Sequence, residues 1–194
     1  MGTTKEAFPD MALNTLALAH DFLRRTVPPG AHCIDATAGR GRDTALLCEL
    51  AGPAGSVLAF DIQASALEQT RALLDSRGLD ARLILDSHEN MARYVASQSV
   101  DCIVFNFGRL PGGDPQIFTR AASSVRAVRA GLDLLRPGGV MSLSLYYGGP
   151  NGYEERDALL DFFRTIDDRQ YSVLVCDWAN RRNDPPMPVF LWRA

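Results

Sequence analysis

The sequence predicts an α/β protein with a doubly wound, Rossmann-like sheet of seven strands, mostly parallel and ending in an antiparallel hairpin. Short, almost continuously apolar segments alternate with helical patterns, which is typical of parallel strands covered by helices on both faces. A length of 194 residues fits one domain, and no repeat, low-complexity segment or long linker divides the chain. We therefore expect residues 1–194 to form a single domain, in which residues 1–30 supply an N-terminal helix packed on the sheet.

The order of these segments gives the expected elements. Strands are predicted at residues 31–36, 56–61, 81–86, 100–106 and 140–146. Helices are predicted between them at residues 42–51, 64–76, 88–96 and 116–135. A helix at 152–166 and strands at 171–178 and 189–193 follow, and an amphipathic helix at 11–25 precedes the first strand. No helix fits between the last two strands, so we expect a hairpin connected by residues 179–188.

Composition sets the broad class. Hydrophobic residues make up 46% and charged residues 22%, which is ordinary for a globular protein and too apolar for a disordered one. No apolar run approaches the roughly 20 residues that span a bilayer, and residues 1–10 lack the pattern of a signal peptide. A cytoplasmic protein without membrane partners is expected.

The charge pattern limits the partners. The net charge of −3 argues against a broad basic face that coats long nucleic acid, but leaves room for a compact basic patch. Lys5 is the only lysine, so nearly all positive charge is arginine, whose planar guanidinium suits phosphate. The four cysteines are scattered without a C-x-x-C pair, so we expect them to be structural and expect no metal site.

A glycine loop follows the first predicted strand, where doubly wound sheets bind their ligands. Residues 35–44 read D-A-T-A-G-R-G-R-D-T, and the two glycines allow a tight turn and a close approach to a ligand. Thr44 stands where the dinucleotide fingerprint needs a third small residue, which counts against a nicotinamide dehydrogenase. Asp35 would repel a pyrophosphate but can engage the ammonium of an amino acid. The ligand-binding residues expected in this loop are Asp35, Thr37, Gly39, Gly41, Asp43 and Thr44.

Acidic residues also end the second and third strands. Asp61 lies roughly 20 residues beyond the glycines, where a carboxylate can accept from both hydroxyls of a ribose. Ile62 and Gln63 follow it, and Asp86, Ser87 and His88 are expected at an adenine edge. Each acid alone could instead cap the next helix. Three acidic strand ends in register favour a nucleoside site.

The motifs together resemble a known class. L-x-P-G-G at residues 135–139 is physically only a helix end and a turn. With D-x-x-x-G-x-G after the first strand and an acid after the second, it resembles class I S-adenosylmethionine-dependent methyltransferases. The resemblance implies that fold and S-adenosylmethionine as cofactor, held also by Asn106.

The loop after the fourth strand carries the expected chemistry. In amino-group methyltransferases this position has Asp or Asn followed by an aromatic, here Asn106 and Phe107. The Asn carbonyl can accept an N–H bond from a substrate amine, and the aromatic ring offers a stacking face. Tyr146 is a second candidate for stacking. The alternative interpretation of the following glycines and proline is a plain connector.

A narrower resemblance covers nearly the whole chain. The segments IDATAGRGRDTALL, FDIQASALEQT, DSHENM, FNFGRLPGGD, LRPGG and NRRNDPP, in this order, resemble the small bacterial family labelled putative rRNA methylases. The resemblance implies methylation of the aminomethyl group on the wobble uridine of tRNA, with the anticodon loop as partner. Arg40, Arg109, Pro115 and Gly149 depart from the family pattern, so the exact substrate is left open.

Further residues have two interpretations each. His88 or Asp114 could accept the proton of the amine, or His88 could contact the cofactor and Asp114 cap a helix. His20 could take part in chemistry or pack over the cleft. Phosphate or base contacts are expected from Arg109, Arg181, Arg182 and Asn183, although surface arginines are commonly just solvated.

These features predict an RNA N-methyltransferase. A small-metabolite methyltransferase and a noncatalytic adenosine-nucleotide binder are the alternatives, and a homodimer is compatible with the sequence.

Overall fold

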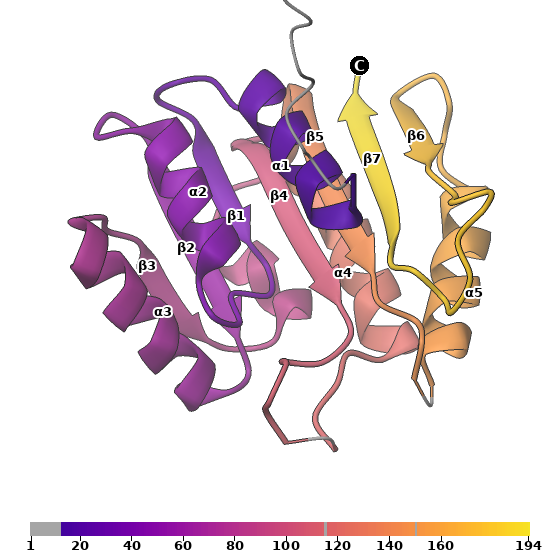
Figure 1. Cartoon of the computed structure of the whole chain (residues 1–194). Helices are drawn as coiled ribbons and strands as arrows, with labels where there is room; N and C mark the ends of the chain where they lie inside the picture. Colours follow the sequence, from indigo (N-terminus) through magenta and orange to yellow (C-terminus); the bar gives the residue numbers. More distant parts are fainter. Residues whose placement is uncertain (1–12, 115, 150) are drawn as a thin grey trace, which may run out of the picture.

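The computed structural model describes residues 13–114, 116–149 and 151–194, which form one seven-stranded sheet flanked by helices (Figure 1). The strand order is β3-β2-β1-β4-β5-β7-β6; the first five strands are parallel, and β7 pairs antiparallel with both β5 and β6. The predicted doubly wound sheet with its C-terminal hairpin is confirmed. The strands are β1 His32–Asp35, β2 Ser56–Asp61, β3 Arg82–Leu85, β4 Val100–Phe107, β5 Leu135–Leu145, β6 Tyr171–Val175 and β7 Met187–Arg193.

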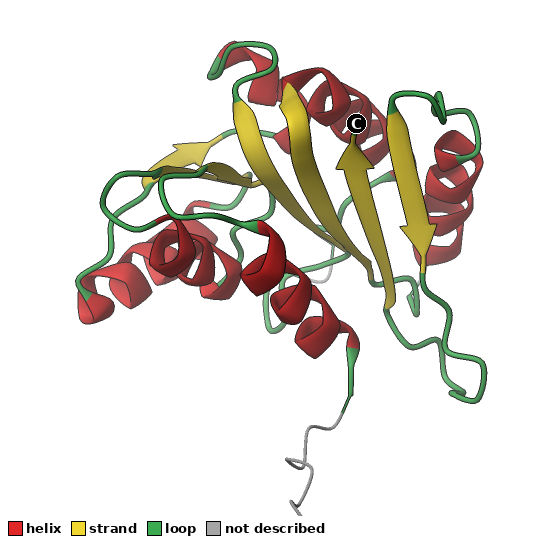
Figure 2. Ribbon diagram, turned by 90° about the horizontal axis from the view of Figure 1, so that it is seen from above, coloured by secondary structure: helices red, strands yellow, loops and turns green. Residues whose placement is uncertain are grey.

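Helices cover both faces of the sheet (Figure 2). One layer holds the first three helices, and the other holds the short 3-10 helix η1 with the last two. The bounds are α1 Thr15–Thr26, α2 Arg42–Ala51, α3 Ala64–Arg77, η1 His88–Arg93, α4 Ala121–Leu134 and α5 Gly152–Phe163. Of the predicted helix at 11–25, residues 11 and 12 lie outside the described residues.

The core follows from the alternation of side chains along the strands. In β1, Cys33 packs in a cluster with Leu47 of α2 and Leu74 of α3, whereas Ile34 packs on the opposite face with Val128 of α4 and Leu159 of α5. These six side chains are almost fully buried. A strand buried on both faces must be apolar throughout, which is why the continuous apolar runs predicted the sheet.

Two predicted helices are shorter than expected. The predicted helix 116–135 begins only at Ala121, because Asp114 accepts bonds from the N–H groups of Gln116 and Ile117 in a turn, and Thr119 is bonded to Gly108. The predicted helix 88–96 is a 3-10 helix that ends at Arg93. Local side-chain bonds to the backbone compete here with a regular α-helix.

The connection into β5 also differs from the expected turn. Leu135 already pairs with Val100, and the ladder shifts register before Cys102 pairs with Val140. The predicted turn at 136–139 is therefore an irregular start of the strand. No helix in the described part of the chain is long and apolar enough to cross a membrane.

Gly41 provides a test of how the glycine loop is packed. Its φ of 77° is left-handed, and an added Cβ would lie 2.9 Å from the Cα of Thr70 in α3. We expect Gly41→Ala to lower the free energy of unfolding by about 1–3 kcal/mol more than Gly78→Ala, since overpacking adds to the backbone strain. Gly78 is the control because it is also left-handed, with no atom within 4 Å of the added Cβ. Urea unfolding measures both, and equal losses would contradict the packing role.

Candidate active site

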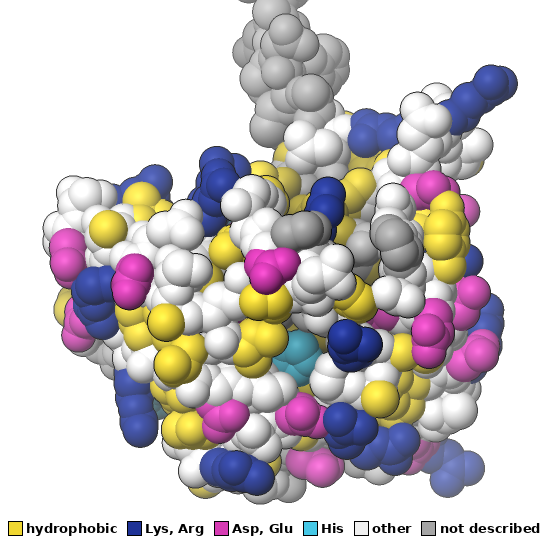
Figure 3. Space-filling view, turned by 90° about the horizontal axis from the view of Figure 1, so that it is seen from below, with side chains coloured by type: hydrophobic (Ala, Val, Ile, Leu, Met, Phe, Trp, Pro, Cys, Tyr) yellow, Lys and Arg dark blue, Asp and Glu magenta, His cyan; other side chains and the backbone are white. Residues whose placement is uncertain are grey.

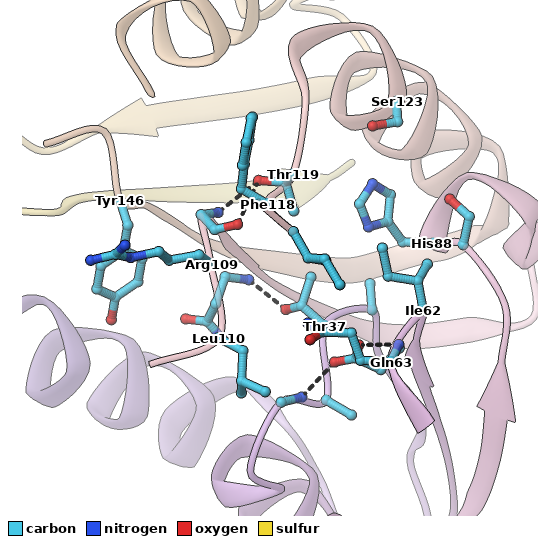
Figure 4. A pocket seen from close by; sticks show the side chains of 18 of the residues that line it. Thr37, Ile62, Gln63, His88, Arg109, Leu110, Phe118, Thr119, Ser123 and Tyr146 are labelled. Atoms are coloured by element: carbon cyan, nitrogen blue, oxygen red, sulfur yellow. Dashed lines mark hydrogen bonds between the residues drawn. The ribbon is translucent and has the colours of Figure 1, made fainter. Parts of the chain in front are cut away.

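A cavity of about 690 Å³ opens at the carboxyl edge of the parallel strands, a volume typical of small-molecule sites (Figures 3 and 4). Segments that follow β1, β2, β3, β4 and β5 line it, together with the start of α4. From β1 the strands are added toward one side of the sheet as far as β3, and β4 then begins the other side. The cavity therefore lies at the point where strand order reverses. Acidic and basic side chains are mixed over this face (Figure 3).

The glycine loop is tied to the carboxylate that ends β2. Gly39 has a left-handed φ of 53°, and its N–H donates to Asp61 Oδ2 at 2.9 Å. The other oxygen, Oδ1, accepts from the N–H of Gln63 at 2.9 Å. Burial raises the pKa of Asp61, which lines the cavity. A carboxylate has about four acceptor positions, so both oxygens can still accept ribose hydroxyls.

The carboxylate that ends β3 is held more tightly. Asp86 Oδ1 accepts from the N–H of Ser87 and from Asn90, both at 2.7 Å, and Oδ2 accepts from the Tyr94 hydroxyl at 2.8 Å. The bonds from Asn90 and Tyr94 lower the pKa of Asp86. Asp86 is thus an oriented, ionised acceptor in the cavity wall.

His88 lies beside this acid with its ring in the cavity wall (Figure 4). Only 8% of the residue is exposed, and the ring packs edge-on against Phe105 and Phe107. Its Nε2 is buried and has no partner among the described residues. Burial lowers the pKa of His88 to about 4, so the imidazole is neutral and a weak proton acceptor. The ring lines the cavity, but its Nε2 is enclosed and the imidazole is neutral, so in this conformation that nitrogen is not placed to act as the predicted base.

Three residues predicted to bind the ligand do not line the cavity. Asp35 is fully buried and accepts from the Thr37 N–H at 3.1 Å and the Thr44 hydroxyl at 2.6 Å. Burial, and secondly the charge of Asp43, raise the pKa of Asp35 to about 7. The predicted contact of Asp35 with an ammonium is therefore wrong for this conformation. Asp35 and Thr44 brace the loop from inside, and Gly41 makes room for α3.

Asn106 ends β4 in the cavity wall and is held from two sides. Its backbone N–H donates to Thr37 Oγ1 at 2.7 Å, and its side-chain Nδ2 donates to Asp43 Oδ2 at 2.6 Å. Asp43 Oδ1 lies 2.6 Å from Nε2 of His20 in α1. Sequence reasoning singled out all three side chains, but had no signal for their contact, because they lie far apart in the chain.

The other predicted catalytic residues lie outside the cavity. Phe107 points into the core, stacked on Phe105 with ring centroids 5.0 Å apart, and its side chain is fully buried. The strand alternation turns Phe107 away from the face that Asn106 occupies, so the predicted stacking role is wrong in this conformation. Asp114 is exposed and bonds only to its own turn.

The predicted substrate residues divide into two groups. Arg109 and Tyr146 line the cavity, opposite His88 and Ser123 in Figure 4. Arg181 stacks on Trp178 and donates to the carbonyl of Leu13, outside the cavity. Arg182 and Asn183 are exposed and also lie outside it.

Sequence reasoning missed the residues that shape the loop between β4 and α4. Thr119 donates its N–H to the Gly108 carbonyl at 2.8 Å and accepts from the Gly108 N–H at 2.7 Å, which closes the loop at its base. The buried Glu155 accepts from Thr119 and Ser124. A threonine, a serine and a lone acid of a later helix carry no sequence signal for this arrangement. Further cavity residues that the sequence did not indicate include Arg42, Leu110, Phe118 and Arg120.

The fold and site define an S-adenosylmethionine-dependent methyltransferase of class I fold. The chain belongs to the family described as "Putative rRNA methylase", whose model matches residues 57–191. A protein of Arabidopsis thaliana named "tRNA (mnm(5)s(2)U34)-methyltransferase, chloroplastic" is 35% identical over 186 residues, covering 90% of this chain and 67% of that protein.

Solved structures agree with this assignment. A "putative rRNA-methylase" from Clostridium thermocellum is 36% identical with a TM-score of 0.91, covering 94% of this chain and 98% of that one. A "putative methyltransferase" from Streptococcus mutans in complex with SAH is 34% identical with a TM-score of 0.86, covering 95% and 100%. SAH is the product that S-adenosylmethionine leaves after methyl transfer, so the relative's ligand matches the cofactor expected here.

Asp61 tests the cofactor contact. We expect Asp61→Ala to weaken SAH binding at least about tenfold, because charge-assisted hydrogen bonds of a carboxylate contribute about 1.5–3 kcal/mol each. Titration calorimetry with SAH measures the dissociation constant. Asp168→Ala is the control, since Asp168 is exposed on the connection before β6. An unchanged affinity in Asp61→Ala would remove the proposed ribose contact.

Asp35 tests the buried acid through pH. Its pKa is about 7 in the folded chain and 3.8 as the ordinary value, so the folded protein keeps a proton that the unfolded chain loses. The stability from this proton is present at low pH and is lost as the pH rises to about 7. Asparagine does not ionise. The free energy of unfolding of Asp35→Asn, relative to wild type, should therefore rise between about pH 4 and 7 and then level off.

Urea unfolding at a series of pH values measures this difference. Asp168→Asn removes an exposed carboxylate and serves as the control. A difference for Asp35→Asn that stays flat with pH would show that Asp35 is ionised throughout.

Proposed function

We propose that this methyltransferase N-methylates an exocyclic amine of RNA, specifically the 5-aminomethyl group of the wobble uridine of tRNA. The observation that carries the proposal is Asn106. Its side chain lines the cavity, and its Oδ1 has no donor among the residues the structure describes. A free amide acceptor at the end of β4 suits a substrate that brings an N–H, as an amine does.

The chemistry asked of the chain is mainly positioning. When bound, S-adenosylmethionine supplies a sulfonium methyl: the amine nitrogen bonds to the methyl carbon, the carbon–sulfur electron pair stays on sulfur, and the product ammonium loses a proton to water. Asn106 Oδ1 would accept one N–H of the amine and so direct its lone pair. Asp61, Asp86 and His88 would hold the adenosine, as their places in the wall allow.

Arginines around the cavity support an RNA substrate. Arg40, Arg42, Arg109, Arg120 and Arg126 all line it, although the chain as a whole carries a net charge of −3. These arginines lie among the acidic side chains of the cavity and offer phosphate contacts to a short single-stranded segment, which RNA-binding proteins splay out base by base. Tyr146, which is 44% exposed, and Phe118 are the aromatic rings available to a base.

The name of the Arabidopsis relative supports the choice of acceptor, because that protein is named for the wobble position of tRNA. The family description points to rRNA instead. The cytoplasmic location and the homodimer both stay predictions from the sequence.

Nucleoside mass spectrometry tests the acceptor. We expect the enzyme, with S-adenosylmethionine, to add one methyl to 5-aminomethyluridine nucleosides of tRNA taken from cells that lack this gene. Asn106→Ala should lower the rate roughly a hundredfold, because misplacing a reacting group costs on that order. Ribosomal RNA and free amine metabolites are the competing acceptors. Methylation of either, with the wobble uridine unchanged, would replace the proposal.

A further inference from the structure

We propose that Asp43 and His20 act as positioning residues, which fix the amide of Asn106 with its oxygen turned toward the cavity. The consequence for the reaction rests on the function proposed above. The observation is a continuous chain of short contacts, from His20 Nε2 to Asp43 Oδ1 at 2.6 Å and from Asp43 Oδ2 to Asn106 Nδ2 at 2.6 Å.

The chemistry of a carboxylate makes this contact directional. An ionised carboxylate only accepts hydrogen bonds, so the Asn106 amide must present its NH₂ group to Asp43. The amide oxygen then lies on the opposite side of the planar group. Asn106 lines the cavity, and that oxygen has no donor in the described part of the chain. An asparagine without Asp43 would be free to turn over and offer a donor to the amine, which repels its N–H.

Helices α2 and α1 both hold Asp43 in place. It lies in the first turn of α2, where the helix dipole stabilises a negative charge. His20 of α1 binds its other oxygen, and the side chains of His20 and Asp43 are only 19% and 12% exposed. Water therefore competes little for these bonds. The charged and titratable groups facing Asp43 are His20, Asp35 and Tyr146, the latter two having their pKa raised in part by its charge.

His20 has a directional role of its own. A carboxylate oxygen accepts, so Nε2 of His20 must carry the hydrogen in this contact. An asparagine placed at position 43 would turn its oxygen to His20 and its NH₂ to Asn106. The amide of Asn106 would then turn over to accept, and its NH₂ would face the cavity.

A double variant that exchanges the two side chains tests the direction of the contact. Asp43→Asn leaves two amides in contact, and Asn106→Asp brings two carboxylates together. The double variant D43N/N106D has the same side chains and charge as wild type, with the pair exchanged. Its asparagine donates to the new carboxylate, which again presents an acceptor to the cavity.

We expect each single variant to lower kcat on tRNA at least about tenfold, and the double variant to recover to within about threefold of wild type. The dissociation constant of SAH should stay within about threefold in all of them, because the effect is on the acceptor. His20→Ala should lower kcat by less than Asp43→Asn. His32→Ala is its control, since His32 begins β1 at the amino end of that strand and does not line the cavity.

Two outcomes overturn the proposal. A double variant no more active than the single variants means that the orientation of the pair does not matter. A loss of SAH affinity parallel to the loss of kcat means that Asp43 is a cofactor ligand and not a positioning residue.

A measurement without any acceptor separates this proposal from the proposed function. In ¹H–¹⁵N spectra of the SAH complex, the Asn106 side-chain amide, assigned by its loss in Asn106→Ala, should shift strongly in Asp43→Asn. An amide signal that does not move contradicts the contact. If wild type fails to methylate tRNA while this signal moves, the proposed function is wrong and the positioning by Asp43 stands.

Discussion

The site depends on the parallel pairing of β1 with β4 in the middle of the sheet. Cys33, Ile34 and Asp35 pair with Cys102, Ile103 and Val104, so both strands release their chains at the same edge. The segment after β1 is the glycine loop, and Asn106 is the next-to-last residue of β4. The hydrogen bond from the Asn106 N–H to Thr37 Oγ1 at 2.7 Å then joins the two segments beyond the last ladder pair. The glycine loop and the segment that carries Asn106 are therefore joined at one point of the sheet.

Carboxylates organise this edge in two different ways. Asp35 is fully buried, and its raised pKa shows that the interior favours its protonated form. It acts as a bracket for the loop. Asp61, Asp86 and Asp43 all line the cavity and receive hydrogen bonds from N–H groups or hydroxyls of the protein. Acids that look equivalent in the sequence thus divide by burial into a structural group and a cavity group.

The sheet and the strand-end acids were predictable from the sequence, but the burial of each acid was not. The sheet, its order of elements and the hairpin follow from apolar periodicity, and the acidic strand ends follow from the rule that ligands bind at carboxyl edges. Asp35 could not be separated from Asp61 by sequence, because the burial of a strand-end side chain depends on neighbouring elements. Phe107 is different: the alternation of side chains along β4 already places it on the face opposite Asn106. The loop residues Phe118 and Thr119 were assigned to a helix because Thr119 is held by Gly108 and by Glu155, which are distant in the sequence.

One departure from the family pattern, Arg40, has a structural role at this edge of the sheet. Arg40, which lies between the two glycines, donates to the carbonyl of Pro111 at 2.6 Å. This bond links the glycine loop to the loop after β4. Gly112 lies close to the same side chain: a Cβ added there would be 3.0 Å from the Arg40 guanidinium. A shorter side chain at position 40 could not span that gap. Arg40 therefore ties the glycine loop to the loop after β4, and Asp61 and Asn106 both line the cavity between them.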